Sequence, residues 1–307
     1  MIDIILNGRL GNQLFMYAMA RKLQIQYNKK DIYINTSLLE ENNCQNSLLS
    51  YEINRNVKFY NKKLRTRNNS FHGSIFQHLN FMKYFKETGN MNFSEIVSYE
   101  DKMERGYKSR GMFICRDRYK EYKDISNKRC IIAYGYFQSP KYFDDIRELL
   151  VKELTPKNKI LEKNREIHKD ICTSNSVCVS VRLGDDFLTN DIYNVCTLDY
   201  YKSAIQYLKQ ELENPKFFIF SDKPELLKEK FKGLDIDMVF ESGNDPDYEK
   251  LRIMSACKHF ILSNSSFSWW CQYLSNYKEK RVVAPSRWYN GDVPCDIYMD
   301  SWYLIEP

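Results

Sequence analysis

Hydroxyl side chains gather at a point of the chain where a helix is expected to begin. Residues 258–274 read KHFILSNSSFSWWCQYL, which predicts a short buried strand, a turn rich in Ser and Asn, and then a helix. The start of a helix presents free backbone N–H groups and the positive end of the helix dipole, so it suits an anion. Asn264, Ser265, Ser266 and Ser268 would add polar side chains to such a site. The alternative is that the hydroxyls only cap the helix.

An arginine follows a second apolar run. Residues 177–187 read VCVSVRLGDDF, which places Ser180 near the end of a predicted strand and Arg182 just beyond it. A lone buried charge is costly, so the guanidinium needs a partner. Either Asp185 or Asp186 supplies one, or an anionic ligand does, because a guanidinium can bind two phosphate oxygens at once. Both interpretations are open at this point.

Two further segments place carboxylates near predicted strand ends. Residues 217–222 (FFIFSD) put Ser221 and Asp222 at a strand tip. There Asp222 would accept hydrogen bonds from ribose hydroxyls or from the edge of a guanine; the alternative is that it caps the next helix. Asp245-Pro-Asp247 resembles a short Asp-x-Asp metal motif, but its proline and the helix predicted after it favour capping.

A glycine-containing loop lies between the first predicted strand and helix. Residues 8–13 read GRLGNQ, so Gly8 and Gly11 flank Arg9, and Asn12 follows. Glycine permits positive φ and close backbone approach. The spacing is neither that of the dinucleotide fingerprint nor that of a P-loop. A ligand-binding loop and a tight structural turn are therefore both consistent with it.

Composition narrows the class of protein. The 307 residues are 43% hydrophobic and 15% aromatic, and the net charge of +6 is too small to indicate nucleic-acid binding. The nine cysteines form no Cys-x-x-Cys pair, and Cys172, Cys178 and Cys257 lie in contexts typical of reduced buried thiols. With four histidines and no His-Glu-x-x-His motif, we expect no metal site. No signal peptide or membrane-length apolar run is seen, so we expect a cytoplasmic protein.

The elements that must position these residues follow an alternating pattern. Ile2–Leu6, the helical pattern after the glycine loop, and Asp31–Asn35 form a Rossmann-type opening. Residues 36–128 show little regularity apart from an aromatic helical stretch at 71–85. We expect a strand at 131–137, a helix from 143 to 154, and a second amphipathic helix ending near Cys172. The domain junction is therefore expected near residue 158.

The second half alternates more clearly. Strands are expected at 177–181, 216–220, 238–241, 260–263 and 281–284, and helices at 198–212, 224–231, 247–256 and 267–275, the first of them capped by Thr197. This repetition predicts a parallel sheet covered on both faces, whose ligands bind beyond the carboxyl ends of the strands. Residues 180–186, 221–222 and 263–266 all lie at such ends, so we expect them to form one site.

Four blocks of this chain resemble bacterial α-1,2-fucosyltransferases of glycosyltransferase family 11. They are Gly8-Arg-Leu-Gly-Asn-Gln-Leu-Phe-x-Tyr-Ala18, Gly135-Tyr-Phe-Gln-Ser-x-Lys-Tyr-Phe143, Met254-Ser-x-Cys-Lys-His-x-Ile261 with Ser263-Asn-Ser-Ser-Phe-Ser-Trp-Trp270, and Ala284-Pro-x-x-Trp288. The blocks occur in the order typical of the family. The resemblance implies a GT-B fold with two facing Rossmann-like domains, 1–158 on the acceptor side and 159–307 on the donor side, the last segment returning to the first domain.

The resemblance also implies a reaction and a set of binding residues. GDP-β-L-fucose would be the donor, and fucose would be transferred with inversion to the 2-hydroxyl of a terminal galactose, without a metal or other cofactor. Arg182 and Asn12 would act on the leaving diphosphate and the sugar. Donor binding is expected from Gly8, Arg9, Gly11, Ser180, Asp185, Ser221, Asp222, Asn264, Ser265, Ser266 and Ser268.

One block departs from the family pattern. His-x-Arg-Arg-x-Asp is replaced by Ser180-Val-Arg-Leu-Gly-Asp185, so the first arginine is kept and the second is not. Loss of one charge-assisted contact would weaken donor binding by about 1.5–3 kcal/mol if nothing replaces it. The alternatives are thus a related transferase with another donor or acceptor, a weak or inactive homologue that binds GDP-sugars or glycans, and a structural partner in polysaccharide assembly. The general base stays unassigned among Asp185, Asp186 and carboxylates of the first domain.

The basic run Asn61-Lys-Lys-Leu-Arg-Thr-Arg67 is typical of a solvated loop. The alternative is a peripheral contact with the anionic surface of the inner membrane.

Overall fold

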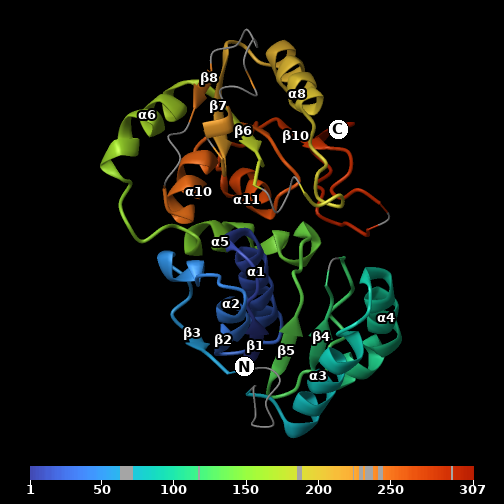
Figure 1. Ribbon diagram of the computed structural model, residues 1–307. Helices are drawn as coiled ribbons and strands as arrows, with labels where there is room; N and C mark the ends of the chain where they lie inside the picture. The colour runs from blue at the N-terminus through green and yellow to red at the C-terminus, as the bar shows by residue number, and fades with distance from the viewer. Residues whose placement is uncertain are drawn as a thin grey trace. The chain divides into compact units, whose positions relative to one another are not determined.

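The computed structural model describes residues 1–62, 72–116, 118–184, 189–223, 225–227, 231, 238–240, 245–291 and 293–307. The chain divides into two compact units, Met1–Thr155 with Val293–Ile297, and Pro156–Asp292 with Tyr298–Pro307. Each unit contains a parallel sheet flanked by helices (Figure 1). The predicted α/β class, with two Rossmann-like domains of parallel strands, is confirmed.

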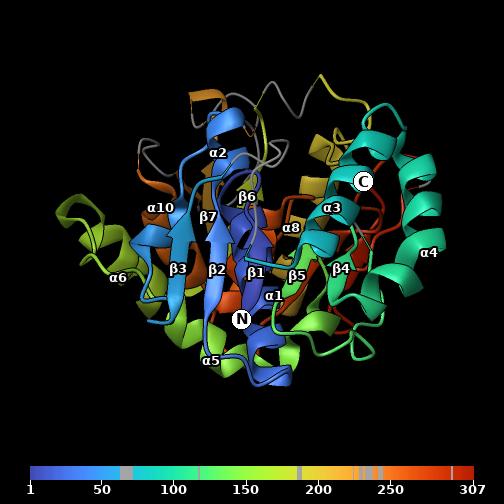
Figure 2. The same cartoon turned by 90° about the horizontal axis from the view of Figure 1, so that it is seen from below.

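The first unit is built on a five-stranded sheet in the order β3-β2-β1-β5-β4, which Figure 2 shows from left to right. The strands are β1 (Ile2–Ile5), β2 (Ile32–Asn35), β3 (Val57–Tyr60), β4 (Met112–Ile114) and β5 (Ile131–Tyr134). In the central register, Ile2 pairs with Ile32 on one side and Ile131 on the other. All three are fully buried, as expected for parallel strands covered on both faces.

The helices of this unit are α1 (Leu10–Gln26), α2 (Ser37–Glu41), α3 (Ile75–Thr88), α4 (Phe93–Ser109) and α5 (Arg147–Glu153), with the 3-10 turns η1 (Ser47–Ser50), η2 (Pro140–Tyr142) and η3 (Asp144–Ile146). α3 and α4 lie side by side over the β5–β4 half of the sheet (Figures 1 and 2). Each begins with a capping box, from Ser74 and Gln77 in α3 and from Asn92 and Glu95 in α4. The helix expected from residue 143 instead begins with 3-10 turns, because backbone N–H groups there bond three residues back.

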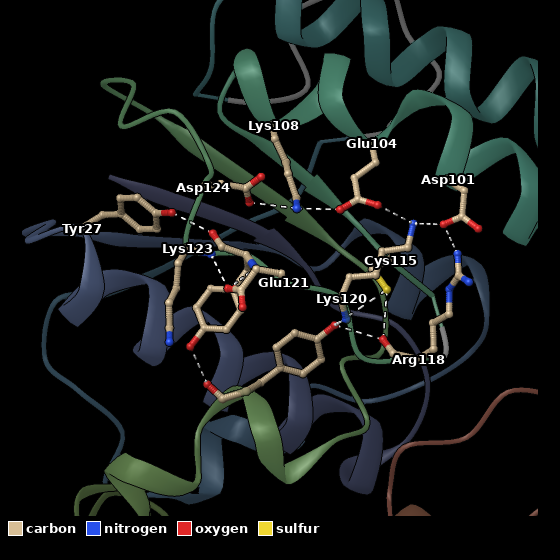
Figure 3. Close-up of polar contacts among 12 residues, drawn as sticks. Tyr27, Asp101, Glu104, Lys108, Cys115, Arg118, Lys120, Glu121, Lys123 and Asp124 are labelled. Carbon is tan, nitrogen blue, oxygen red and sulfur yellow. Dashed lines mark hydrogen bonds and ion pairs between the residues drawn. The ribbon is translucent and has the colours of Figure 1, made fainter.

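A network of polar contacts attaches the segment after β4 to α4 (Figure 3). Lys108 of α4 forms ion pairs with Glu104 at 2.6 Å and Asp124 at 2.8 Å. Lys120 reaches Asp101 at 2.9 Å and Glu104 at 3.5 Å. Both lysine side chains are more than nine-tenths buried, so their ammonium groups are held inside the unit rather than presented to solvent.

The second unit is built on a six-stranded parallel sheet in the order β11-β10-β9-β6-β7-β8. The strands are β6 (Asn175–Val181), β7 (Pro215–Ser221), β8 (Met238–Phe240), β9 (His259–Ile261), β10 (Val282–Pro285) and β11 (Tyr303–Ile305). The helices are α6 (Arg165–Thr173), α8 (Leu198–Glu211), α10 (Asp247–Ser255) and α11 (Ser266–Leu274), preceded by the 3-10 turn η4 (Glu162–Asn164). The predicted cap of α8 is confirmed, since Thr197 Oγ1 accepts from Tyr200 N at 3.2 Å.

Some sequence predictions need correction, and others cannot be compared. Cys178 and Cys257 are buried thiols as expected, but Cys172 is exposed because it lies on the outer side of α6, whose buried residue is Ile171. Asp185, Asp186, Lys63 to Arg67 of the basic run, and most of the helix expected at 224–231 lie outside the described residues. Within the described part of the chain, no helix is long and apolar enough to cross a membrane.

Candidate active site

Three adjacent strands of the second unit end beside one another at the same edge of the sheet. Val179 of β6 pairs with Ile261 of β9, and Val181 of β6 pairs with Ser221 of β7. The residues that follow these strands are therefore neighbours at the carboxyl edge, where ligands of parallel sheets bind. The predicted convergence of the three polar strand ends is thus borne out by the register.

Arg182 is held by a carboxylate from the neighbouring strand. Its Nη1 lies 2.7 Å from Asp222 Oδ2, and the two side chains are 20% and 24% exposed. Asp222 was not among the partners expected for this arginine. The pair leaves a partly exposed guanidinium at the carboxyl edge, fixed in direction by a bond to its own sheet.

Asp222 also organises the backbone beyond β6. Its two oxygens accept from Leu183 N at 2.8 Å and Gly184 N at 3.0 Å. The preceding Ser221 bonds locally, because its Oγ accepts from Lys223 N at 3.1 Å and donates to Asp222 Oδ1 at 3.3 Å. Asp222 thus acts as a clamp on the segment that carries Arg182. The first residue of the helix that it was alternatively expected to cap lies outside the described residues, so the two interpretations are not compared.

The N-terminus of α11 lies at the end of β9, next to β6. Ser265 is the N-cap residue, with extended backbone angles and no side-chain capping bond, and the first helical bond runs from Trp269 N to Ser265 O. The backbone N–H groups of Ser266, Phe267 and Ser268 precede that bond and point along the positive end of the dipole. Capping by these serine hydroxyls was the alternative interpretation, and the structure does not support it.

Two of the serine hydroxyls near this turn are buried and make no hydrogen bond to the described residues. The side-chain oxygens of Ser263 and Ser268 have no hydrogen-bond partner among the described residues, and both residues are at most 1% exposed. Ser265 and Ser266 are partly exposed. The backbone of the first turn, with Ser265 and Ser266, is therefore the part of this segment that can meet an anion.

Asn264 has a structural role that its sequence context did not reveal. Its Nδ2 donates to Tyr193 O and Trp288 O, both at 2.9 Å, and its Oδ1 lies 3.5 Å from Cys196 Sγ. Burial raises the pKa of the Cys196 thiol to about 12, so it remains a protonated donor at neutral pH. The side chain of Asn264 thus joins three segments around the start of α11.

A pair of buried tyrosines on α8 fixes two of the strand ends from behind. Tyr200 donates to Leu262 O at 2.6 Å, and Tyr201 donates to Ser180 O at 3.1 Å. Burial raises the pKa of both phenols well above the usual value, so they act as neutral donors. Ser180 is 8% exposed and is held through its carbonyl.

In the first unit, the loop after β1 adopts a conformation that requires glycine. Gly8 has φ +76°, and a Cβ built there would lie 2.6 Å from Asn12 Nδ2. Gln13 fixes the turn by donating to Gly8 O at 2.9 Å and Gln45 O at 2.8 Å. Arg9 is the N-cap of α1, and Gly11 lies within the helix. The structure thus shows a constrained turn that presents Asn12 near the start of α1.

A contact that sequence reasoning missed orients Asn12. Gln138 Nε2 donates to Asn12 Oδ1 at 2.9 Å, from a segment that directly follows the neighbouring strand β5. That segment is strained at the buried Phe137, which has φ +52°. Gly135 allows a close backbone approach, because a Cβ at this position would lie only 1.7 Å from Cys115 O. The sequence analysis identified the block of residues 135–143, but the sequence did not predict that Gln138 contacts Asn12.

The described residues contain no group of three His, Cys, Asp or Glu side chains that could hold a metal ion. Asp245 of the Asp-x-Asp sequence bonds Lys163 at 2.6 Å and Asn164 at 2.7 Å. The N-cap of α10 is Pro246, which makes no side-chain bond, so the predicted capping by the aspartate is wrong. Asp245 instead ties η4 to the start of α10.

The profile described as "Glycosyl transferase family 11" matches residues 1–306. The chain belongs to glycosyltransferase family 11. The family prediction made from the four sequence blocks is thereby confirmed.

Two curated relatives of this family 11 chain come from Escherichia coli. An O-antigen biosynthesis glycosyltransferase, WbnK, is 26% identical over 97% of this chain and 98% of its own length. An α-1,2-colitosyltransferase is 34% identical over 62% of this chain and 68% of its own length.

Solved structures resemble the chain in fold. The family 9 glycosyltransferase from Veillonella parvula has a TM-score of 0.45 and 12% identity, covering 99% of this chain and 86% of that one. POFUT1 in complex with GDP also has a TM-score of 0.45 with 12% identity, covering 92% of this chain and 97% of that one.

Proposed function

We propose that this family 11 glycosyltransferase moves L-fucose from GDP-β-L-fucose to the 2-hydroxyl of a terminal galactose, with inversion and without a metal. The observation that carries the proposal is the position of Arg182 at the end of β6, one strand from the N-terminus of α11. A fixed guanidinium and free helix N–H groups at one sheet edge are suited to a diphosphate.

In the proposed reaction, the acceptor hydroxyl attacks the anomeric carbon while the bond from that carbon to the diphosphate oxygen breaks. The bonding electrons leave with GDP, and the hydroxyl proton passes to a base that we do not assign. Arg182 and the first turn of α11 stabilise the negative charge that develops on the leaving diphosphate. Asn12, oriented by Gln138, donates from its amide to the sugar or the β-phosphate.

The proposal keeps the other predicted donor-binding residues but changes the roles of some of them. Ser180, Ser221 and Asn264 would act through the backbone or as supports, because their surroundings hold them in place. Asp222 would act by clamping Arg182. Asp185 stays a candidate for donor binding or base catalysis. We place the reaction in the cytoplasm, with an oligosaccharide acceptor.

A second donor has a specific observation in its favour. The relative that is 34% identical over 62% of this chain is named as a colitosyltransferase. Colitose is fucose without its 3-hydroxyl, so the same leaving group and the same attack on the anomeric carbon apply. The choice between the two donors depends on whether a polar group of this chain contacts the 3-hydroxyl.

The test is to incubate the protein with GDP-fucose or GDP-colitose, a panel of β-galactosides and EDTA, and to measure GDP release and product mass. Transfer of a deoxyhexose to the galactose 2-hydroxyl in the presence of EDTA supports the proposal. Preferred transfer of the dideoxyhexose supports the second donor. Binding of a GDP-sugar with no transfer to any galactoside would replace the proposal by a weak or binding-only homologue, and no binding would refute it.

A further inference from the structure

Helix α3 carries apolar side chains on two opposite faces. Phe81 and Tyr84 are fully buried in the core beside β4 and β5. Ile75, Phe76 and Leu79 are 62%, 69% and 57% exposed. We call these three residues the α3 patch. A helix with an apolar outer face beside an apolar inner face is usually covered on both, so the patch indicates a binding surface.

The patch is held rigidly at the amino edge of the sheet. Gln77, between its members, is buried and donates to Arg110 O and Cys130 O, each at 2.9 Å. Its Oε1 accepts from Ser74 N at 2.8 Å, which completes the capping box. Arg110 and Cys130 lie just before β4 and β5, so the patch is at the opposite edge from the strand ends that carry Asn12 and Gln138.

Exposed cations border the α3 patch. Lys83 and Lys86 follow Leu79 by four and seven positions, so they continue the same outward stripe of α3, and both are exposed. Arg110 and Arg129 are exposed beside the backbone groups that anchor Gln77. The apolar centre is thus flanked by basic groups on the helix and on the neighbouring turns.

Other charges along this edge strengthen the positive character. Lys29 Nζ donates to Lys128 O at 2.8 Å. The nearby carboxylates Asp31 and Asp124 are already in ion pairs with Lys58 and Lys108. α3 itself contains one acidic residue, Glu87, against two lysines.

We propose that the α3 patch docks this protein on the surface of an anionic phospholipid bilayer. Ile75, Phe76 and Leu79 would insert below the headgroups, while Lys83 and Lys86 bind lipid phosphates with their stems along the apolar layer. A second copy is a poor occupant, because a two-fold contact through the patch would bring the same cations face to face. The proposal does not rest on the proposed sugar donor or acceptor.

Such docking leaves the candidate active site of the first unit accessible. Asn12 and Gln138 follow the carboxyl ends of β1 and β5, whereas the patch is anchored ahead of the amino ends of β4 and β5. A reaction at the carboxyl edge can therefore proceed while the amino edge is on the bilayer.

The test is sedimentation of the purified full chain with vesicles of equal parts phosphatidylglycerol and phosphatidylethanolamine, compared with phosphatidylcholine vesicles. We expect the wild type to bind the anionic vesicles and to be released by salt. The double variant F76S/L79S should bind at least about tenfold more weakly. K83E/K86E should bind more weakly and with less salt sensitivity than the wild type, because Arg110 and Arg129 remain. L226S removes a side chain that is 46% exposed in the second unit and should bind like the wild type.

Circular dichroism and transfer to a soluble acceptor check that the variants are folded. Failure of the wild type to bind anionic vesicles, or full binding by F76S/L79S, would overturn the proposal. Light scattering that shows a wild-type dimer and an F76S/L79S monomer would assign the patch to a second copy and overturn it as well. Vesicle binding by a protein that transfers no sugar would contradict only the proposed function.

Discussion

At the scale of single residues, Asp222 at the end of β7 positions Arg182 at the end of β6, and Arg182 carries the charge that faces the sheet edge. Asp222 accepts from two backbone N–H groups and from the guanidinium, so it fixes both the main chain and the side chain of the arginine. Arg182 retains partial exposure toward the sheet edge. A cation held in this way needs little reorganisation when negative charge develops beside it.

Replacing Arg182 by alanine should therefore lower kcat for transfer by about 10²–10³, equivalent to about 2.7–4 kcal/mol of charge stabilisation. R182K should retain part of the activity, because the charge remains and the two-pronged geometry is lost. Steady-state kinetics measures this loss, with whichever GDP-sugar the transfer assay shows to be the donor. The matched control is R165A, since Arg165 is an exposed arginine of the same unit, paired with Glu162. Near-normal turnover of R182A would remove Arg182 from the mechanism.

The contact between Gln138 and Asn12 leads to a second prediction at this scale. Gln138 donates to Asn12 Oδ1, which leaves the Asn12 amide N–H groups to serve as donors to a ligand. In Q138E, the carboxylate can only accept, so the Asn12 amide should turn and present its oxygen instead. We expect kcat/KM to fall by about tenfold, the loss of one hydrogen bond. In Q138A, kcat/KM should fall less, because the side-chain amide of Asn12 remains free to rotate and donate to the ligand.

The measurement is kcat/KM for both variants beside thermal unfolding midpoints. A larger loss in Q138E than in Q138A, with similar midpoints, separates orientation of Asn12 from a purely structural effect. Equal activities of Q138E and wild type would refute a donor role for Asn12.

At the scale of elements, β9 contains a buried histidine whose protonation opposes folding. His259 Nδ1 accepts from Arg281 N at 3.0 Å and its Nε2 lies 3.1 Å from Asn175 Oδ1, so the neutral ring fits both partners. Burial lowers its pKa from 6.5 to about 4, with Lys258 and Arg281 adding to the effect. Between pH 6.5 and 4, the unfolded chain binds more protons at this position than the folded one.

Stability should therefore fall as the pH is lowered from 6.5 toward 4, with His259 contributing roughly 1–3 kcal/mol to the loss. Urea unfolding monitored at several pH values measures the free energy of unfolding directly. The variant H259Q offers no titrating group, so its stability should depend less on pH in this window. An identical pH dependence in H259Q would exclude His259 as the cause.

The elements also show where sequence patterns suffice and where they fail. β6, β7 and β9 were predicted within two residues of their bounds, because strands buried on both faces read as continuous apolar runs. α4 was missed although Asn92 and Glu95 form its capping box, since its surface-facing residues dilute the apolar pattern. Cys172 was misjudged from its apolar sequence context, although it lies on the outer side of α6 beside the buried Ile171.

The candidate site was predictable in outline and not in its contacts. Parallel strands place their following residues at one edge, so Arg182, Asp222 and the start of α11 could be grouped from the sequence. Which carboxylate pairs with Arg182 depends on strand order, which the sequence did not give. The bond from Gln138 to Asn12 joins residues 126 positions apart through a strained turn, and no local pattern reports such a contact.

At the scale of the whole molecule, ligand binding should couple to folding of the chain. A ligand that binds only the native state stabilises it by RT ln(1 + [L]/Kd), about 2.7 kcal/mol at a concentration of 100 Kd. If the edge formed by Arg182 and α11 binds the donor diphosphate, GDP should raise the thermal unfolding midpoint of the wild type, and GMP should raise it less. EDTA should leave the GDP effect unchanged, because the proposed binding uses a guanidinium and helix N–H groups instead of a metal.

R182A makes this measurement specific to the site. The variant loses the charge that faces the diphosphate, so its midpoint should rise less with GDP than that of the wild type, while R165A should respond fully. Differential scanning fluorimetry over a series of GDP concentrations gives the apparent Kd for each variant. If EDTA abolished the stabilisation, a metal would have to bridge the diphosphate and the proposed metal-free chemistry would be wrong. If R182A and wild type gave the same Kd, the diphosphate would bind elsewhere on the chain.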